Sequence, residues 1–215
     1  MHKCLDNLLF IQNEINKNLE TKPNIIAVTK TFKINQILPL VNSGHQDYGE
    51  NKVQEALEKW TDIKNDFSHI KLHMIGKLQT NKVKHAVSLF DYIHSIDNLK
   101  LAEKISNEEL KLNKKLKLFV QINIGNEIQK NGIEIDQLNN FYRICTKDLG
   151  LNIIGLMCLP PKNKEVINYF LKMKQLSNNI GVKDLSMGMS QDYMEAAKSG
   201  STFLRIGSKI FGERL

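Results

Sequence analysis

Eight short runs rich in β-forming residues recur along the chain, each followed by a stretch with helical character. The runs are 25–30, 46–49, 70–75, 91–95, 116–124, 151–158, 184–187 and 203–206. Because helical crossovers join parallel strands, this alternation predicts a parallel sheet covered by helices. Eight such units predict one closed (β/α)8 TIM barrel domain over residues 1–215, with an extra N-terminal helix at 3–20.

The expected periodicities are clearest in one strand and one helix. Along the strand at 116–124, alternate positions place on one face Leu118, Val120, Ile122 and Ile124. Along the helix at 164–178, spacings of four, three and three build an apolar stripe from Val166, Phe170, Met173 and Leu176. Further helices are expected at 98–113 and at 35–43, and Pro39 weakens the second of these predictions.

An open doubly wound sheet is the competing architecture. Its usual dinucleotide signature, G-x-G-x-x-G after the first strand, is absent from the sequence, and so is a Walker A motif. The chain has 215 residues, whereas about 250 are typical of a (β/α)8 barrel. The sequence therefore favours a compact barrel with few insertions.

The net charge of +7 comes from 30 basic and 23 acidic residues and is spread along the chain, with its densest patch at 111–117. Only 7% of the residues are aromatic. A nucleic-acid-binding protein more often clusters basic and aromatic residues on one face. We therefore assign the charge to solubility and to some attraction for anionic ligands, and expect no nucleic-acid partner.

Cysteine usage and the N-terminus point to the cytoplasm. Cys4, Cys145 and Cys158 follow no C-x-x-C spacing and cannot all pair, which indicates a reducing compartment. No signal peptide is evident, and no apolar run approaches the roughly 20 residues of a membrane helix. We expect no metal site, because His69 and His73 lie in a predicted strand, where side chains four apart do not converge as they do on a helix. No G-x-S-x-G elbow is present either.

Lys30 ends the first predicted strand, at the edge of the barrel where (β/α)8 proteins place their chemistry. A cation at the end of a buried strand is costly because it loses water. Burial or a second cation can lower a lysine pKa enough to leave a neutral amine, which forms Schiff bases with carbonyl compounds. The alternative is a lysine that extends to the rim and contacts only water.

Two loops that pair glycine with serine follow the last two predicted strands. Gly188 with Ser190, and Gly207 with Ser208, combine accessible backbone N–H groups with hydroxyl donors. Barrels often bind phosphate with these two loops and a short extra helix, here expected at 208–211. Alternatively, Ser190 is only the N-cap of a helix at 191–199.

Arg205 precedes the second of these loops, and it either points into the barrel mouth or pairs with a structural carboxylate. An amine at one strand end facing a phosphate site at two others fits one ligand well. Pyridoxal phosphate carries an aldehyde for the amine and a phosphate for the loops.

Six blocks in the sequence resemble the pyridoxal phosphate homeostasis proteins over nearly the whole chain. They are AVTKT at 27–31, GENKVQE at 49–55, HMIGKLQTNK at 73–82, GLM at 155–157, LSMGMSxD at 185–192 and RIGSxxFG at 205–212, where x is any residue. The resemblance implies a single barrel like the N-terminal domain of alanine racemase. Three positions differ from the usual pattern: Lys52 replaces an aromatic residue, Ser208 replaces a threonine, and Pro39 interrupts a helix.

The resemblance also implies roles for individual residues. Lys30 matches the Schiff-base lysine, and Arg205 matches a residue near the pyridine nitrogen or the phosphate. An arginine at that nitrogen would leave the ring unprotonated and a weaker electron sink. The other matching positions are Asn51 and Met157, which line the cofactor, Lys130 near its mouth, and the phosphate-loop residues Ser186, Ser190, Gly207 and Ser208.

The function implied by the resemblance is cofactor homeostasis without catalysis. The chain would be a cytoplasmic monomer that binds pyridoxal 5'-phosphate, and apoenzymes that use the cofactor are candidate recipients. Racemase chemistry of the alanine racemase type needs a second acid–base residue, supplied with the help of a further domain, and we expect none after Leu215. Three alternatives remain: a small pyridoxal phosphate-dependent racemase or lyase, a nucleic-acid-binding protein, and a structural barrel without a ligand. The reactivity of Cys158, expected near the mouth, is left open.

Overall fold

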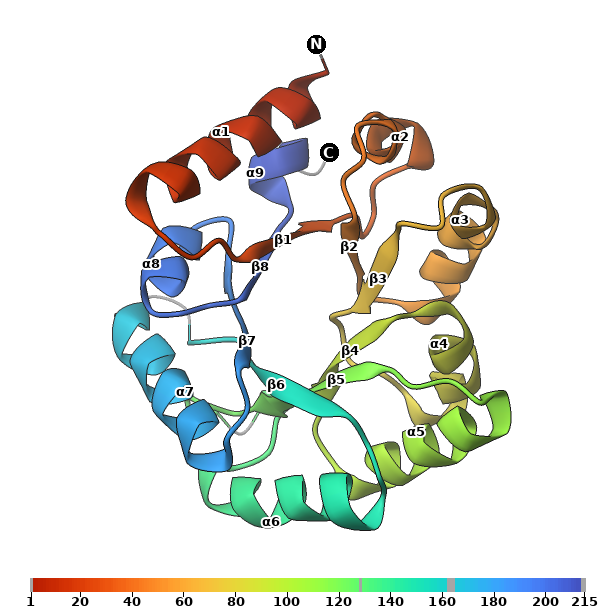
Figure 1. Cartoon of the computed structure of the whole chain (residues 1–215), viewed down its shortest axis with the longest axis vertical. Helices are drawn as coiled ribbons and strands as arrows, with labels where there is room; N and C mark the ends of the chain where they lie inside the picture. Colours follow the sequence, from red (N-terminus) through yellow and green to blue (C-terminus); the bar gives the residue numbers. More distant parts are fainter. Residues whose placement is uncertain (1, 128, 162–164, 214–215) are drawn as a thin grey trace.

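In the computed structural model, which describes residues 2–127, 129–161 and 165–213, eight parallel strands close into a barrel in sequence order (Figure 1). The strands are β1 Asn24–Val28, β2 Asp47–Glu50, β3 Lys71–Met74, β4 Tyr92–Ile96, β5 Lys117–Ile122, β6 Ile153–Cys158, β7 Asp184–Met189 and β8 Phe203–Ile206. β1 pairs with both β2 and β8, and this pairing closes the sheet. The predicted (β/α)8 barrel is confirmed.

Helices surround this barrel, and an additional helix precedes β1, as predicted. Within the described residues the α-helices are α1 Lys3–Asn18, α2 Ile34–Asn42, α3 Val53–Asp66, α4 Val83–Leu89, α5 Leu99–Leu112, α6 Leu138–Arg143, α7 Val166–Ile180, α8 Tyr193–Lys198 and α9 Ser208–Phe211. Position 164, the predicted start of the seventh helix, lies outside the described residues. None of the helices in the described part of the chain is both long and apolar enough to cross a membrane.

Local signals explain where the helices begin and end. α5 begins after Asn98, whose side-chain oxygen accepts the Leu101 N–H, and it ends at Asn113 with a left-handed φ of 47°. α2 forms although Pro39 lies inside it, because its apolar face is buried through Ile37 and Leu40. Burial of an amphipathic face outweighs a single unfavourable residue in a helix of this length.

The barrel has two apolar layers. The larger lies between the strands and the helices and includes Leu118 and Val120, the outward-facing residues of β5. The smaller fills the barrel interior with Ile26, Tyr92, Phe119, Met157 and Phe203. Alternation along each strand separates the two layers, so the interior is packed and the space for a ligand lies at the strand ends.

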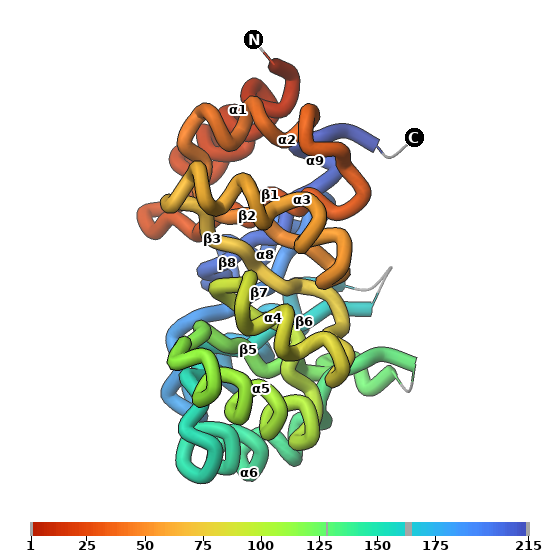
Figure 2. Tube along the Cα trace, turned by 90° about the vertical axis from the view of Figure 1, so that its right-hand side faces the viewer, coloured from red at the N-terminus to blue at the C-terminus, as the bar shows by residue number. Residues whose placement is uncertain are grey.

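The first and last helices meet on one side of the barrel. α1 and α9 lie side by side, with α5 and α6 at the opposite side of the barrel (Figures 1 and 2). The Asn7 side chain of α1 donates to the Ile210 carbonyl of α9 at 2.9 Å. The N-terminal helix therefore stabilises the short α9, which follows the last strand and begins at Ser208.

Candidate functional site

Lys30, Asn51 and Gly207 meet at the carboxyl ends of three adjacent strands, which we call the mouth of the barrel. Val28 of β1 pairs with Gly49 of β2, so Lys30 and Asn51 follow at equivalent positions. Gly207 follows β8 directly, and a Cβ atom placed on it would lie 3.3 Å from the Val28 carbonyl oxygen. The structure therefore brings the predicted lysine beside the second glycine–serine loop.

Side chains from β2 and α3 hold the backbone on both sides of Lys30. Before it, the Thr29 hydroxyl donates to Glu50 Oε1 at 2.7 Å. After it, the Thr31 N–H donates to Glu55 Oε1 at 2.5 Å, and Thr31 has a φ of 68°. A residue other than glycine in this left-handed region costs on the order of 1–3 kcal/mol, and the surrounding structure has to compensate. The Glu55 hydrogen bond is part of that compensation, and it fixes where the half-buried Lys30 leaves the barrel.

A buried ion pair completes this support. Lys59 of α3 donates to Glu50 Oε1 at 2.8 Å and to the Thr29 carbonyl at 2.9 Å, and its side chain is only 9% exposed. The same Glu50 oxygen accepts the Trp60 indole N–H at 3.0 Å. The sequence analysis does not predict this cluster, because Glu50 and Glu55 enter it only as part of the motif at 49–55. The spacing of four between Glu55 and Lys59 on a helix was the available signal.

The loops after β7 and β8 gather hydrogen-bond donors around one point. The Ser190 hydroxyl oxygen accepts the backbone N–H groups of Gly207 and Lys209, each at 3.3 Å. The predicted helix at 208–211 is confirmed as α9, so these N–H groups lie at a helix N-terminus. Ser190 is not the N-cap of α8: Asp192 occupies that position and accepts the Met189 N–H at 2.6 Å. The arrangement can bind an anion.

Arg205 and Ser186 lie inside the barrel, beneath the mouth. Arg205 is 4% exposed and donates to the Ser186 hydroxyl at 2.6 Å and to the Cys158 carbonyl at 2.8 Å. Both acceptors are neutral, so these contacts leave the guanidinium charge uncompensated. Burial lowers the pKa of Arg205 from its ordinary value, yet arginine remains protonated in proteins.

Ser186, predicted as one of the phosphate-binding residues, lies in β7 and not in the loop that follows it. The predicted strand at 184–187 already includes Ser186, and β7 extends two residues further, to Met189. The Ser186 side chain points into the barrel, where it contacts Arg205 and also His94 Nδ1 at 2.8 Å. Residue spacing in the sequence does not indicate this contact between Ser186 and His94.

Met157, Cys158 and Lys130 occupy different surroundings. Met157 is 1% exposed in the interior layer, where it pairs across strands with Ser186. Cys158 is fully buried on the outward face of β6, and burial raises the pKa of its thiol to about 12, which makes it unreactive. Lys130 lies in the loop after β5, where it pairs with Glu127 at 2.5 Å and donates to the Pro160 carbonyl at 3.1 Å.

Cavities lie at both ends of the barrel. One of about 460 Å³ opens at the mouth, and its lining includes Asn51, Gly76, Lys77 and Lys82. Gly76 allows the Asn51 backbone to approach closely, because a Cβ atom on Gly76 would lie 2.4 Å from the Asn51 carbonyl oxygen.

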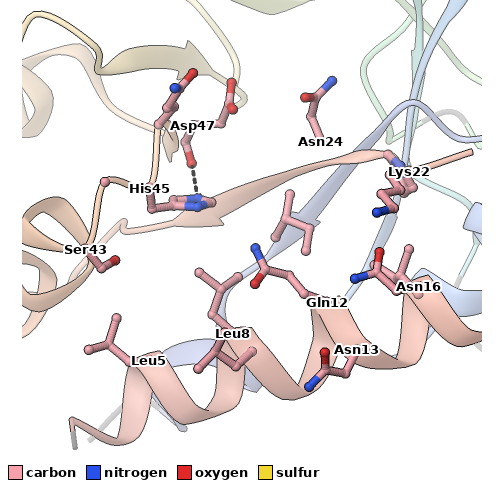
Figure 3. Close-up of a pocket in the computed structure, with 16 residues that line it drawn as sticks. Leu5, Leu8, Gln12, Asn13, Asn16, Lys22, Asn24, Ser43, His45 and Asp47 are labelled. Carbon is pink, nitrogen blue, oxygen red and sulfur yellow. Dashed lines mark hydrogen bonds between the residues drawn. The ribbon is translucent and has the colours of Figure 1, made fainter.

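A larger cavity, of about 840 Å³, lies at the opposite end, which we call the floor, between α1 and the starts of β1 and β2 (Figure 3). In the described part of the chain, no group of three or more His, Cys, Asp or Glu side chains is placed to hold a metal ion.

Comparison with known proteins gives concordant results. The family model "Alanine racemase, N-terminal domain" matches residues 5–215. A "Pyridoxal phosphate homeostasis protein" from Aquifex aeolicus is 35% identical over 204 residues, which cover 91% of this chain and 89% of that protein. The protein of the same name from Haemophilus influenzae is 34% identical and covers 97% and 94%.

A solved structure is similar in fold over its full length. PipY from Synechococcus elongatus, described with PLP bound, has a TM-score of 0.86 and 29% identity and covers 97% of this chain and 100% of that one. The length of the matches, the barrel topology and the agreement of family model and relatives all point the same way: this chain belongs to the pyridoxal phosphate homeostasis protein family, whose barrel is that of the alanine racemase N-terminal domain.

Proposed function

We propose that this protein binds pyridoxal 5'-phosphate at the barrel mouth through a Schiff base on Lys30 and helps to keep the cofactor supplied, without catalysing a reaction. The names of the relatives and the PLP-bound state of PipY support the ligand. The observation that carries the proposal is the position of Lys30 at the end of β1, next to the donors gathered around Ser190 on the β8 side.

The residues at the mouth fit the chemistry of this cofactor. When bound, pyridoxal phosphate supplies an aldehyde for an amine and a dianionic phosphate for hydrogen-bond donors. Lys30 supplies the amine. The N–H groups of Gly207 and Lys209, now bonded to the Ser190 oxygen, and the hydroxyls of Ser190 and Ser208 supply the donors. Asn51 lines the mouth cavity, and Met157 packs in the interior apolar layer.

The properties of Arg205 favour a protein that binds the cofactor over one that uses it for catalysis. Its guanidinium carries donors only and stays protonated, so a ring nitrogen that faces it must act as the acceptor. A ring held in that form stabilises carbanions poorly. Arg205 would therefore orient the cofactor and at the same time restrain its reactivity.

We also place the protein in the cytoplasm as a monomer that supplies apoenzymes. The three cysteines are buried and free, as expected in a reducing compartment. The family's relation to alanine racemase keeps a racemase or lyase as the second candidate.

Titration of the purified protein with pyridoxal phosphate, followed by absorption, tests the proposal. Lys30→Ala should abolish the Schiff-base absorption, whereas Lys82→Ala, a matched loss of a lysine that lines the mouth cavity, should retain it. Equal spectra for the two variants would refute the role of Lys30. Incubation of the loaded protein with single enantiomers of amino acids separates the two functions: racemisation that Lys30→Ala abolishes would establish the enzyme instead.

A further inference from the structure

A continuous series of hydrogen bonds crosses the barrel interior from the floor to the mouth. Asp47 Oδ1 contacts His73 Nε2 at 3.0 Å, and His73 Nδ1 contacts His94 Nε2 at 3.0 Å. His94 Nδ1 contacts the Ser186 hydroxyl at 2.8 Å, and Arg205 donates to that hydroxyl at 2.6 Å. We call these five residues the interior network. They come from β2, β3, β4, β7 and β8.

With both histidines neutral, as their burial favours, the chemistry of the two ends fixes the direction of every bond in the interior network. Arginine can only donate and an ionised carboxylate can only accept. His73 therefore donates from Nε2 to Asp47, so its Nδ1 accepts from His94 Nε2. His94 Nδ1 then accepts the Ser186 hydroxyl proton, and the Ser186 oxygen accepts from Arg205. Each histidine is neutral and protonated on Nε2.

The surroundings of the two histidines favour this neutral state. Burial lowers the pKa of His94 well below its usual range, and the neighbouring His73 and Arg205 lower it further. Burial also lowers the pKa of His73, although its hydrogen bond to Asp47 acts in the opposite direction. The rings are stacked as well, His73 on Tyr92 and His94 on Phe119, each pair with centroids 4.2 Å apart.

Asp47 is the terminal acceptor of the network and borders the floor cavity (Figure 3). Burial would raise the pKa of Asp47, but the hydrogen bond and charge interactions with His73, Lys71 and His45 outweigh it, and the pKa is lowered. The carboxylate is thus ionised at neutral pH. It lies at the start of β2, whereas Arg205 lies near the carboxyl end of β8.

We propose that Asp47 is a positioning residue for Arg205, acting through the interior network across the whole barrel. The carboxylate holds both histidines in the tautomer that takes the Ser186 proton, and this leaves the Ser186 oxygen presenting a lone pair to the guanidinium. The inference rests on the proposed function, since it supposes that Arg205 contacts the cofactor.

Removal of the Asp47 carboxylate would leave the hydrogen-bond directions and the histidine tautomers of the interior network no longer fixed. His73 Nε2–H loses its acceptor, so the proton is free to move to Nδ1, where it meets the Nε2–H of His94. His94 must then carry its proton on Nδ1 and point it at Ser186. The Ser186 oxygen would accept from two donors and its own proton would lose its acceptor, so Arg205 would be held less firmly.

The first test uses the protein without cofactor. Nitrogen-15 NMR of the histidine rings should show His73 and His94 neutral and protonated on Nε2. Asp47→Ala should change the tautomer of both, whereas Asp47→Asn, which keeps an acceptor oxygen, should preserve it. Asp91→Ala is the matched control, because Asp91 lies directly before β4 and accepts from Lys64 and the Leu72 N–H, outside the interior network.

The second test measures pyridoxal phosphate affinity in the same variants. We expect Asp47→Ala to weaken binding by about 5- to 10-fold, a typical coupling between distant sites, and Asp47→Asn and Asp91→Ala to stay within about 2-fold of the wild type. His94→Phe keeps the stacked ring, interrupts the interior network in the middle and should reproduce the loss if Asp47→Ala fails to fold.

Unchanged tautomers in Asp47→Ala, or unchanged affinity in both Asp47→Ala and His94→Phe, would overturn the inference. A wild-type protein that forms no Lys30 adduct would instead overturn the proposed function, and the tautomer measurement would still decide whether Asp47 orders the interior network.

Discussion

Replacement of Lys59 by methionine should destabilise the protein more than any exposed charge replacement of the same kind. Methionine retains most of the length of the side chain and removes the ammonium group. Glu50, whose side chain is fully buried, would lose its cationic partner at 2.8 Å, and the Thr29 carbonyl would lose a donor at 2.9 Å.

The magnitude follows from the burial of this pair. The side chains of Lys59 and Glu50 are 9% and 0% exposed, and breaking a buried ion pair by removing one partner costs roughly 3–5 kcal/mol. For a protein of this size, 1 kcal/mol shifts Tm by roughly 2–4 °C, so we expect Tm to fall by roughly 6–20 °C. Removing an exposed partner costs less than about 1 kcal/mol. Arg143→Met, which breaks an ion pair with Asp148 whose side chains are 57% and 52% exposed, is the matched control.

Thermal and urea unfolding measure both variants, and a double substitution isolates the cause. Glu50→Gln added to Lys59→Met neutralises the stranded charge and keeps an acceptor for Thr29 and Trp60, so it should restore at least about 1 kcal/mol. A Lys59→Met protein as stable as Arg143→Met, or a double variant with no recovery, would refute the assignment of this ion pair as the support of the Lys30 loop.

Three further predictions concern other parts of the site. The free energy of unfolding should fall as the pH drops below about 6.5, because the pKa values of His73 and His94 are lowered in the folded protein and the unfolded state therefore binds more protons. Each histidine contributes up to about 1.4 kcal/mol per pH unit. A His94→Phe protein whose unfolding free energy depends on pH as steeply as that of the wild type would contradict this. Cys158, with a thiol pKa of about 12, should resist alkylation in the folded protein and react on unfolding, and fast labelling of the native protein would disprove its burial. Gly207→Ala should weaken phosphate and cofactor binding together, because its Cβ atom at 3.3 Å from Val28 displaces the loop that carries the donors; unchanged binding would show that the loop is not the phosphate site.

The barrel was predictable because its signals are local. Alternation along β5 and the apolar stripe of α7 identify a strand and a helix from neighbouring residues alone. Glycine–serine pairs after the last two strands likewise located the donors around Ser190. Strand ends were less predictable: β7 continues to Met189, two residues beyond the predicted end, so Gly188 of the first glycine–serine pair lies in the strand.

The interior network and the support of Lys30 depend on contacts between residues far apart in sequence. His94 and Ser186 are separated by 92 positions, and Thr29 and Glu50 by 21. Such pairs meet only because the strands close in a particular register, and residue spacing alone does not specify that register. The sequence therefore gives no sign that His73 contacts both Asp47 and His94 in the interior network.

Reduction of the cofactor-loaded protein with borohydride, followed by peptide mass spectrometry, tests the central claim most directly. The reduction fixes a pyridoxyl group on the amine that held the cofactor. The account predicts the adduct on Lys30, with none on Lys77 or Lys82, which line the mouth cavity. An adduct on either of those lysines with Lys30 unmodified would contradict it.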